Sequence, residues 1–384
     1  MKNNRTFLEK LLDGAEVEWK PLIKVASLTR GRVISKEYLA DNVGDYPVYS
    51  SQTVNNGEIG KINSFDFDGE FVSWTTDGAN AGTVFYRSGK FSITNVCGLI
   101  KIQNNLELNY KFLFYWLSIE AKNHVYSGMG NPKLMSHQME KILIPIPPLS
   151  VQTKIVKILD ALTALTSELT SELTLRRKQY EYYREKLLSF DSLEQLNMGG
   201  AKKKLIDVAI YAKVRILADK LDKENYVGVE NLLQNKLGKT SSNYVPTDGA
   251  FIEYLPNDIL IGNIRPYLRK IWLSDRKGGT NGDVLVIRLT DENILPRYLY
   301  HILANEHFFE YNVKYSKGAK MPRGDKAAIL QYEFDVPPLE EQHRIVSILD
   351  KFETLTNSIT EGLPLAIEQS QKRYEYYREL LLSF

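Results

Sequence analysis

QYEYYREKLLSF, residues 179–190, returns almost unchanged as RYEYYRELLLSF, residues 373–384. Ten of the twelve positions are identical. PPLSVQTKIVKILDALTALT at 147–166 likewise matches PPLEEQHRIVSILDKFETLT at 337–356, at eleven of twenty positions. Agreement of this extent predicts that the chain is built twice from one plan.

Weaker echoes of the repeat precede each helical segment. They pair LIKVA (22–26) with LIDVA (205–209), FLFYWL (112–117) with YLYHIL (298–303), and YSGMGNPKL (126–134) with YSKGAKMPR (315–323). We therefore predict a variable domain followed by a helical segment, twice over. The predicted boundaries are 1–146 for the first domain, 147–198 for the first helical segment, 199–336 for the second domain and 337–384 for the second helical segment.

Both helical segments begin after a proline pair and carry apolar or aromatic residues at alternating steps of three and four. That spacing is typical of a coiled-coil seam. Because the first helix ends near the start of the second domain and the second helix begins at its end, we expect them to pair antiparallel. Taken alone, this pattern is explained as well by a packing scaffold or a dimerisation coil as by a specific functional role. The predicted seam comprises Ile155, Ile158, Leu162, Leu165, Tyr180, Tyr183, Ile345, Ile348, Phe352, Tyr374 and Tyr377.

The seam is irregular in both helices. A tandem tetrapeptide, TSEL-TSEL at 166–173, adds a stutter to the first helix. In the second helix the stripe continues through Ile359 in steps of four, and Gly362 and Pro364 are expected to kink or interrupt that helix.

Each variable domain contains short β-rich runs separated by glycine and asparagine turns. The expected strands are 69–76, 82–87 and 97–102 in the first domain, and 258–264 and 283–289 in the second; the expected helices are 110–122 and 296–311. The predicted fold class is therefore α+β: two globular domains with mainly antiparallel sheets, separated by two long antiparallel coiled-coil helices in a pseudo-two-fold repeat.

Polar and basic side chains crowd the loops of both domains. Such sets suit contacts to base edges by Arg, Asn and Gln and to phosphates by Lys. For any single residue, an ordinary exposed loop side chain is the simpler interpretation, so the clusters carry the prediction. The candidate DNA-binding residues are Ser50, Ser51, Gln52, Trp74, Thr76, Asn80, Asn131, Lys133, Asn263, Arg265, Tyr267, Arg269, Lys320 and Arg323.

Composition and motifs limit the possible functions. The net charge is only +2, so a DNA-binding role requires local basic clusters or partner subunits. The single cysteine, Cys97, leaves no disulfide framework or cysteine-rich zinc site. Neither a signal peptide nor an apolar run of membrane-spanning length occurs, so we expect a cytoplasmic protein without a membrane contact. We find no phosphate loop, methyltransferase motif, metal motif or nucleophile elbow, and expect no catalytic or metal site.

Two variable domains alternating with two near-identical helices that end in QYEYYR-type sequence resemble the specificity subunits of Type I restriction-modification systems. The opening LLDGAEVEWKPL, the PPL...Q..IV.ILD segments and the tandem TSEL also look like that family. The likeness covers essentially the whole chain, although Gly362-Leu363-Pro364 interrupts only the second helix.

The resemblance implies that each variable domain is a target recognition domain that reads one half of a bipartite, asymmetric site in double-stranded DNA. It also implies that the helices dock two modification (methyltransferase) subunits and, through them, two restriction subunits. The partner subunits would bind S-adenosylmethionine, ATP and Mg²⁺, and this chain would bind no cofactor. Two alternatives stay open: the recognition subunit of a Type IIB-like system, and a coiled-coil adaptor that does not bind DNA.

Overall fold

The computed structural model describes residues 6–128, 130–188, 201–358 and 360–384. By its internal contacts the chain divides into two compact units, residues 1–168 with 368–384 (unit 1) and residues 169–367 (unit 2). The division falls inside two of the long helices, so each unit combines a globular part with pieces of both helical segments. The boundary predicted at 198/199 and the seam position Ile359 lie outside the described residues.

Unit 1 is built on a six-stranded sheet of order β2-β7-β5-β6-β3-β4. Its pairs are antiparallel except β3 with β6. A separate two-stranded antiparallel pair joins β1 to β8. The elements are α1 (Phe7–Leu12), β1 (Glu18–Pro21), β2 (Ala26–Arg30), α2 (Lys36–Asp41), β3 (Val43–Tyr49), β4 (Glu58–Ile62), β5 (Phe67–Thr75), β6 (Val84–Ile93), β7 (Cys97–Ile102), α3 (Tyr110–Glu120), α4 (Ser136–Met139) and β8 (Leu143–Ile146).

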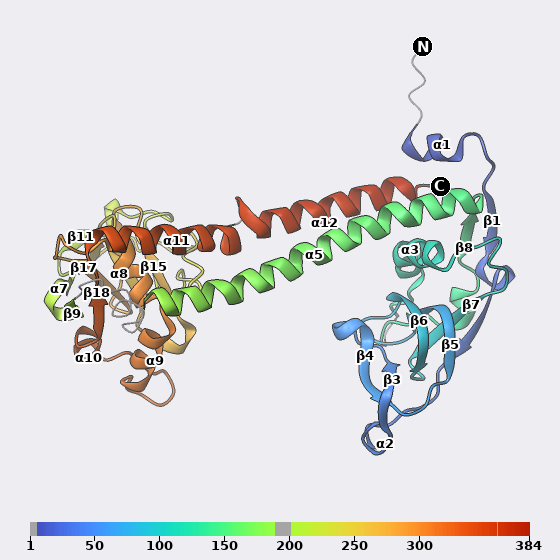
Figure 1. The fold of residues 1–384 in the computed structure, drawn as a ribbon, viewed down its shortest axis with the longest axis horizontal. Coiled ribbons are helices and arrows are strands. Elements are labelled where there is room, and N and C mark those ends of the chain that lie inside the picture. The colour runs from blue at the N-terminus through green and yellow to red at the C-terminus, as the bar shows by residue number, and fades with distance from the viewer. Residues whose placement is uncertain (1–5, 129, 189–200, 359) are drawn as a thin grey trace, which may run out of the picture. The chain divides into compact units, whose positions relative to one another are not determined.

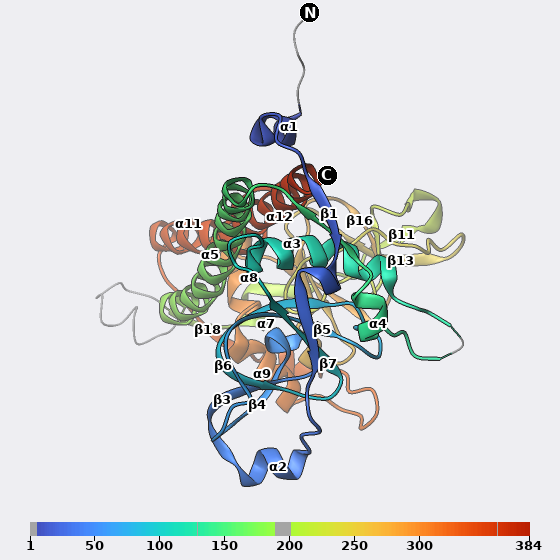
Figure 2. The ribbon, with the colours of Figure 1, turned by 90° about the vertical axis from the view of Figure 1, so that its right-hand side faces the viewer.

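Helix α3 and the long helices share one apolar core with the sheet of unit 1. Asn109 caps α3 by accepting hydrogen bonds from the backbone of Lys111 and Phe112. Phe112, Val72 and Trp74 are fully buried in this core. Trp74 lies over Gly98 of the neighbouring strand, where an added Cβ would stand 2.1 Å from its ring. In Figure 2 α3 is seen beside the sheet that it covers.

Unit 2 repeats the plan of unit 1 but has a second four-stranded sheet. Its four-stranded sheet has the order β10-β17-β14-β15, and a second sheet has the order β11-β13-β16-β12. A pair of β9 with β18 corresponds to the pair of β1 with β8. The elements are β9 (Ala201–Lys204), α7 (Leu205–Val208), β10 (Ala209–Tyr211), β11 (Arg215–Leu217), β12 (Tyr226–Val227), β13 (Ala250–Tyr254), β14 (Ile259–Gly262), β15 (Ile271–Leu273), β16 (Gly278–Thr280), β17 (Val284–Leu289), α8 (Pro296–Leu303), α9 (Glu306–Lys314), α10 (Lys326–Leu330) and β18 (Glu333–Val336).

The predicted second-domain helix at 296–311 is in fact two helices, α8 and α9. Helix α8 ends at Leu303, and Asn305 begins α9 by accepting a hydrogen bond from the backbone N–H of His307. An asparagine at this position favours a new helix start over continuation, because its side chain satisfies a free backbone donor.

The helical segments are α5 (Leu149–Leu187), α11 (Leu339–Asn357) and α12 (Gly362–Leu381). The interruption predicted at Gly362 and Pro364 is confirmed. Gly362 has φ +82°, and an added Cβ would lie 2.6 Å from the carbonyl oxygen of Thr354, so the turn requires glycine. Pro364 follows in the first turn of α12, where a missing backbone N–H costs no hydrogen bond.

Within each unit the helices pair antiparallel, as Figure 1 shows for α5 beside α12. In unit 1 the hydroxyls of Thr166 and Ser370 lie 2.8 Å apart. In unit 2 the ring of Tyr180 stacks on Phe352 with centroids 6.0 Å apart, and Arg177 donates to the carbonyl of Thr356. Partner numbers fall along one helix as they rise along the other, which is the predicted direction.

Candidate nucleic-acid interface

Three loops of unit 1 that are far apart in the sequence converge at the end of β5. The backbone N–H of Gly78 donates to the carbonyl of Pro132 at 3.0 Å, and Asp77 forms an antiparallel bridge with Lys133. The side-chain amide of Asn80 donates to the carbonyl of Ser51 at 3.0 Å. The structure thus brings the three predicted clusters of the first domain, at 50–52, 74–80 and 131–133, to one place.

The predicted residues of unit 1 differ in accessibility. Asn131 and Lys133 are exposed, and Asn80 is partly buried. Ser50, Ser51 and Gln52 are also partly buried; the Ser50 hydroxyl accepts from Thr94 at 2.9 Å, and Gln52 donates to the carbonyl of Glu58. The predicted residues of unit 1 that are at least partly accessible are therefore Ser50, Ser51, Gln52, Asn80, Asn131 and Lys133.

Trp74 and Thr76 have structural roles in unit 1. Both are fully buried. The Trp74 indole donates to the carbonyl of Leu134 at 2.9 Å, and the Thr76 hydroxyl donates to the carbonyl of Val96 at 2.9 Å. These bonds tie the end of β5 to neighbouring loops, so neither side chain is available at the surface for a base contact.

Unit 2 assembles the equivalent loops at the end of β14. Ile264 forms an antiparallel bridge with Arg323, just as Asp77 does with Lys133. The backbone N–H of Arg265 donates to the carbonyl of Pro322 at 2.7 Å. Lys317 closes the second loop by bridging to Arg323. The clusters predicted near 263–269 and 320–323 therefore also lie together.

The predicted residues of unit 2 include a presented aromatic. Arg265 and Arg269 both adopt left-handed backbone conformations, with φ of 52°, on either side of a short 3₁₀ turn that leaves Tyr267 51% exposed. Non-glycine residues in this region are strained, and such strain gathers at functional sites. Arg265, Lys320 and Arg323 are exposed, whereas Asn263 is buried and its Oδ1 has no hydrogen-bond partner among the described residues.

Two of the arginines already have acidic partners in unit 2. Arg269 pairs with Glu306, and Arg323 pairs with Asp283 at 2.9 Å. A base or phosphate contact by either would require an exchange of partners. In unit 1, sequence reasoning missed Arg30, which is exposed and donates to the carbonyl of Asn95 beside the same loops. An arginine at the end of a strand gives no sequence signal for that position.

Matched polar anchors fix the helical segments to each domain. Gln152 and Gln342 are fully buried at equivalent positions. Gln152 donates to the carbonyls of Glu107 and Pro147 and accepts from the backbone of Asn109. Gln342 makes the same three bonds, to Asn293, Pro337 and Leu295.

A carboxylate about two helical turns further along repeats the arrangement with different donors. Asp160 accepts from Lys111 at 2.6 Å and from Tyr115 at 2.7 Å. Its counterpart Asp350 accepts from Arg297 and His301, both at 2.8 Å. The anchor geometry is therefore kept while the donor side chains change.

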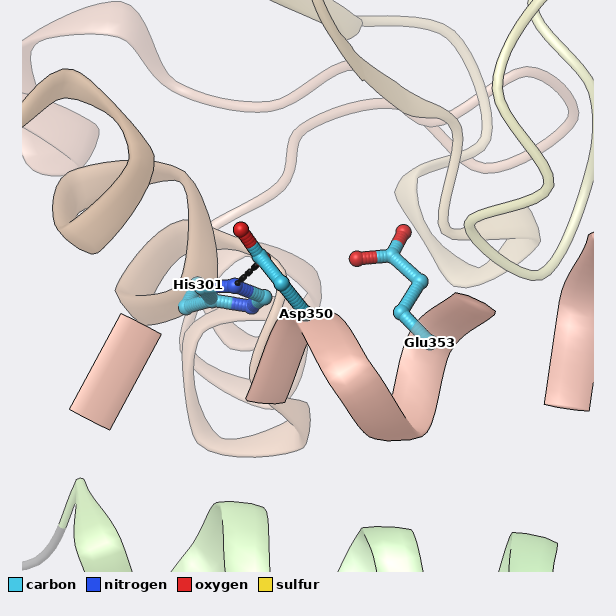
Figure 3. Close-up of side chains that lie close together, drawn as sticks. All are labelled: His301, Asp350 and Glu353. Carbon is cyan, nitrogen blue, oxygen red and sulfur yellow. Dashed lines mark hydrogen bonds and ion pairs between the residues drawn. The ribbon is translucent and has the colours of Figure 1, made fainter. Parts of the chain in front are cut away.

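His301, Asp350 and Glu353 form the one close group of potential metal ligands among the described residues (Figure 3). His301 comes from α8, and the two acids come from α11. Arg297 already bonds Asp350 and, at 2.8 Å, Glu353. Burial lowers the pKa of His301 below its ordinary value. Because the arginine supplies the positive charge between the acids, we assign the group as an ion-pair network that anchors α11.

The predicted seam residues divide between two kinds of contact. Ile155, Ile345 and Tyr180 are buried in the cores of their units. Tyr183 and Leu165 are both 38% exposed, and the ring of Tyr183 stacks on Phe352 with centroids 5.6 Å apart. Partly buried positions make up the remainder, namely Ile158, Leu162, Ile348, Phe352, Tyr374 and Tyr377.

Leu159 and Leu349, which the seam prediction missed, are fully buried. They lie one turn beyond Ile155 and Ile345 and belong to the apolar cores that the helices share with the domains. Each long helix therefore has two packing partners, and a single stripe describes only part of its buried surface.

The structure defines a class of protein with two α+β domains, each carrying a loop cluster, and repeated helices. The family described as Type I restriction modification DNA specificity domain matches residues 15–176 and again residues 199–369. A putative type I restriction enzyme specificity subunit of Haemophilus influenzae is 40% identical over 407 aligned positions, covering 100% of both chains. The chain therefore belongs to the family of Type I restriction-modification specificity subunits.

Further comparisons agree with this assignment. The EcoR124I/EcoR124II specificity subunit of Escherichia coli is 32% identical, covering 99% of this chain and 97% of the relative. The crystal structure of the S subunit of a Type I restriction-modification system from M. genitalium matches with a TM-score of 0.59 at 16% identity, covering 100% of this chain and 96% of that one. That structural likeness confirms the predicted fold class.

Among the helices of the described residues, none combines the length and apolar character needed to cross a membrane.

Proposed function

We propose that this chain reads DNA sequence for a Type I restriction-modification enzyme, with unit 1 and unit 2 each recognising one half of a bipartite, asymmetric target. The observation that carries the proposal is the duplicated loop cluster. The strand order β2-β7-β5-β6 recurs as β10-β17-β14-β15, and a bridged loop pair follows the equivalent strand in each unit. The side chains on these loops differ, which suits two different half-sites.

The loops offer the chemistry that DNA reading needs. Lys133 and Arg323 occupy equivalent bridged positions and are exposed, so they suit phosphate contacts. Hydroxyl and amide groups at Ser50, Ser51 and Gln52 suit base edges in unit 1, and Arg265 with Tyr267 suits them in unit 2. The net charge of +2 is low for an isolated DNA-binding protein, so partner subunits supply much of the positive field.

The helices are the proposed docking surface for two modification subunits, through which two restriction subunits join. Tyr182 and Tyr376 support this role. They occupy equivalent positions in the repeat and are 52% and 62% exposed. Exposed tyrosines are common anchors at protein interfaces. An identical exposed residue on both helices suits two copies of one partner.

Catalysis belongs to the partners under this proposal. The modification subunits would bind S-adenosylmethionine and methylate adenine in each half-site, and the restriction subunits would use ATP and Mg²⁺. This chain then needs only to bind, orient and separate its partners on DNA.

Long-read methylation mapping tests the proposed function. DNA is compared from cells that express this chain with its methyltransferase subunit and from cells that express the methyltransferase alone. A split adenine-methylated motif that requires this chain is expected. An unchanged methylome with an active methyltransferase would instead favour the adaptor alternative, and a fused nuclease-methylase partner would indicate a Type IIB-like system.

Tyr182→Ala and Tyr376→Ala should each weaken binding of the methyltransferase subunit by about tenfold or more, because each removes a half-exposed aromatic anchor. Titration of the purified subunits by calorimetry measures the affinity. Tyr244→Ala provides the control, since Tyr244 is 69% exposed but lies in the second domain, outside the repeated helices. Equal losses in all three variants would contradict a docking role for the helices.

A further inference from the structure

Arg87, in the middle of β6, is a buried arginine that the proposed function does not yet use. Arg87 is only 3% exposed. The guanidinium Nε donates to the Ser73 hydroxyl at 3.0 Å, and Nη1 donates to the carbonyl of Asn56 at 2.8 Å. Its carbon lies 3.6 Å from the ring centroid of Tyr49 and 4.4 Å from that of Phe85.

Every one of these partners of Arg87 is neutral. Arg87 takes part in none of the ion pairs found among the described residues. Burial lowers the pKa of Arg87 to about 10, which still leaves it positively charged at neutral pH. Burying an unpaired charge is costly, and a leucine or methionine would fill such a site at lower cost. The guanidinium therefore has a purpose other than core packing.

The loop that Arg87 holds is the one that carries Ser50, Ser51 and Gln52. Asn55 and Asn56 both have left-handed backbone conformations, with φ of 50° and 54°. Arg87 bonds the carbonyl of Asn56, and an added Cβ on Gly57 would lie 3.1 Å from its Nη2. The carbonyl of Gly57 in turn accepts from the backbone of Ser50 at 2.9 Å. The guanidinium thus holds the end of the loop at Asn56, and the hydrogen bond between the backbones of Ser50 and Gly57 then holds Ser50 in place.

Unit 2 has no arginine at the equivalent position. The matching bridges of Asp77 and Ile264 make Trp74 equivalent to Ile261. Trp74 pairs with Val84, and Ile261 pairs with Ile271, so Val84 is equivalent to Ile271. Arg87 and Ser274 each lie three residues further along the chain, so these two positions correspond. Ser274 is buried, and its hydroxyl donates to the carbonyl of Arg276. A buried arginine at this position of the sheet is therefore a feature of unit 1 alone among the described residues.

We propose that Arg87 is a positioning residue that sets the conformation of the 50–57 loop and, through it, the bases that unit 1 accepts. The inference rests on the proposed function. Arg87 does not touch DNA in this account. Its planar, forked group bonds two oxygens while lying against two aromatic rings, a combination that lysine, with a single ammonium, does not reproduce.

The experiment uses the full chain assembled with its methyltransferase subunit. Methylation rates are measured on duplexes that carry single-base changes in one half-site at a time, once the wild-type motif is known. Arg87→Gln and Arg87→Lys are compared with wild type. Both should lower discrimination at the unit 1 half-site by about tenfold, the scale of one lost base-reading contact, and leave discrimination at the other half-site unchanged.

The lysine variant separates geometry from charge. Arg87→Lys keeps the positive charge, so it should retain the wild-type salt dependence of DNA binding while still losing discrimination. Recovery of full discrimination by lysine would show that charge alone matters and would overturn the positioning role.

Two further variants separate positioning from stability. Ile144→Ala empties part of the core that α3 shares with the sheet, which is separate from the cluster that Tyr49 packs against beside Arg87, and should lower the melting temperature without changing discrimination. Ser73→Ala removes only the Nε acceptor and should cause a smaller loss, about threefold, at the same half-site.

Wild-type discrimination in folded Arg87→Lys and Ser73→Ala complexes would overturn the inference, as would equal losses at both half-sites or in Ile144→Ala. A wild-type chain that directs no split motif would instead overturn the proposed function itself.

Discussion

Buried glutamines at the start of each helical segment show how single residues hold this fold together. Gln152 satisfies three backbone groups of the preceding loops, and Gln342 repeats all three bonds. A buried side chain with every polar atom paired fixes a unique geometry, whereas a half-paired one is costly. These residues therefore specify how each domain meets its helices.

Gln152→Ala should lower the free energy of unfolding by about 2–4 kcal/mol, because it leaves two carbonyls and one N–H buried without partners. Thermal or urea denaturation followed by circular dichroism measures the loss. Thr153→Ala is the matched control, since Thr153 is exposed and its hydroxyl bonds only the carbonyl of Leu149 in its own helix. Equal stabilities of the two variants would contradict the anchoring role.

Lys133→Ala and Arg323→Ala should each weaken DNA binding by the intact complex across all sequences and reduce the salt dependence by about one counterion, as expected for a phosphate contact. Titration at several salt concentrations measures both quantities. Lys101→Ala, an exposed lysine on β7, should behave as wild type. A change in the preferred bases with an unchanged salt slope would assign these residues to base reading instead.

At the residue scale, the sequence predicts composition of the loop clusters better than accessibility. Trp74 and Thr76 lie at the end of the expected strand 69–76, where we predicted exposed base-reading side chains, yet the last residues of β5 and Thr76 after it are buried. Arg87 gives no signal at all, because its role depends on the Asn56 carbonyl, thirty-one positions away. Contacts between residues this far apart in the sequence cannot be predicted from a local sequence pattern.

The long helices are the elements that sequence pattern describes best. Their existence, antiparallel pairing and interruption at Gly362 follow from proline, glycine and apolar spacing. The seam prediction was incomplete because Leu159 and Leu349 also belong to the apolar cores of the domains, which include residues of α3 and α8. Periodicity shows that a face is buried, but it does not identify which neighbour covers it.

Insertion of a third TSEL after Leu173 should lengthen the first helix by about 6 Å, or one to two base-pair steps of about 3.4 Å. We expect a longer unread spacer in the target and unchanged half-sites, because the insertion touches neither loop cluster. Methylome sequencing of cells with the variant checks this outcome. An unchanged spacer, or altered bases in either half-site, would contradict it.

The same plan built twice is the central feature of the whole molecule. The repeat is evident in the sequence at the helices, where identity is high. Within the domains the repeat is evident mainly in the strand order and in the bridged loops. Short sequence similarities such as LIKVA and LIDVA indicate only a small part of it. Backbone architecture persists because it buries the core, whereas the loop side chains are free to differ and so to read different bases.

Replacement of residues 21–146 by the equivalent domain of a relative tests the central claim most directly. The swapped chain is expressed with the same methyltransferase subunit, and the methylome is mapped. One half-site should change while the other half-site stays the same, because each unit carries its own core and loop cluster. A change in both half-sites, or in neither, would contradict the account.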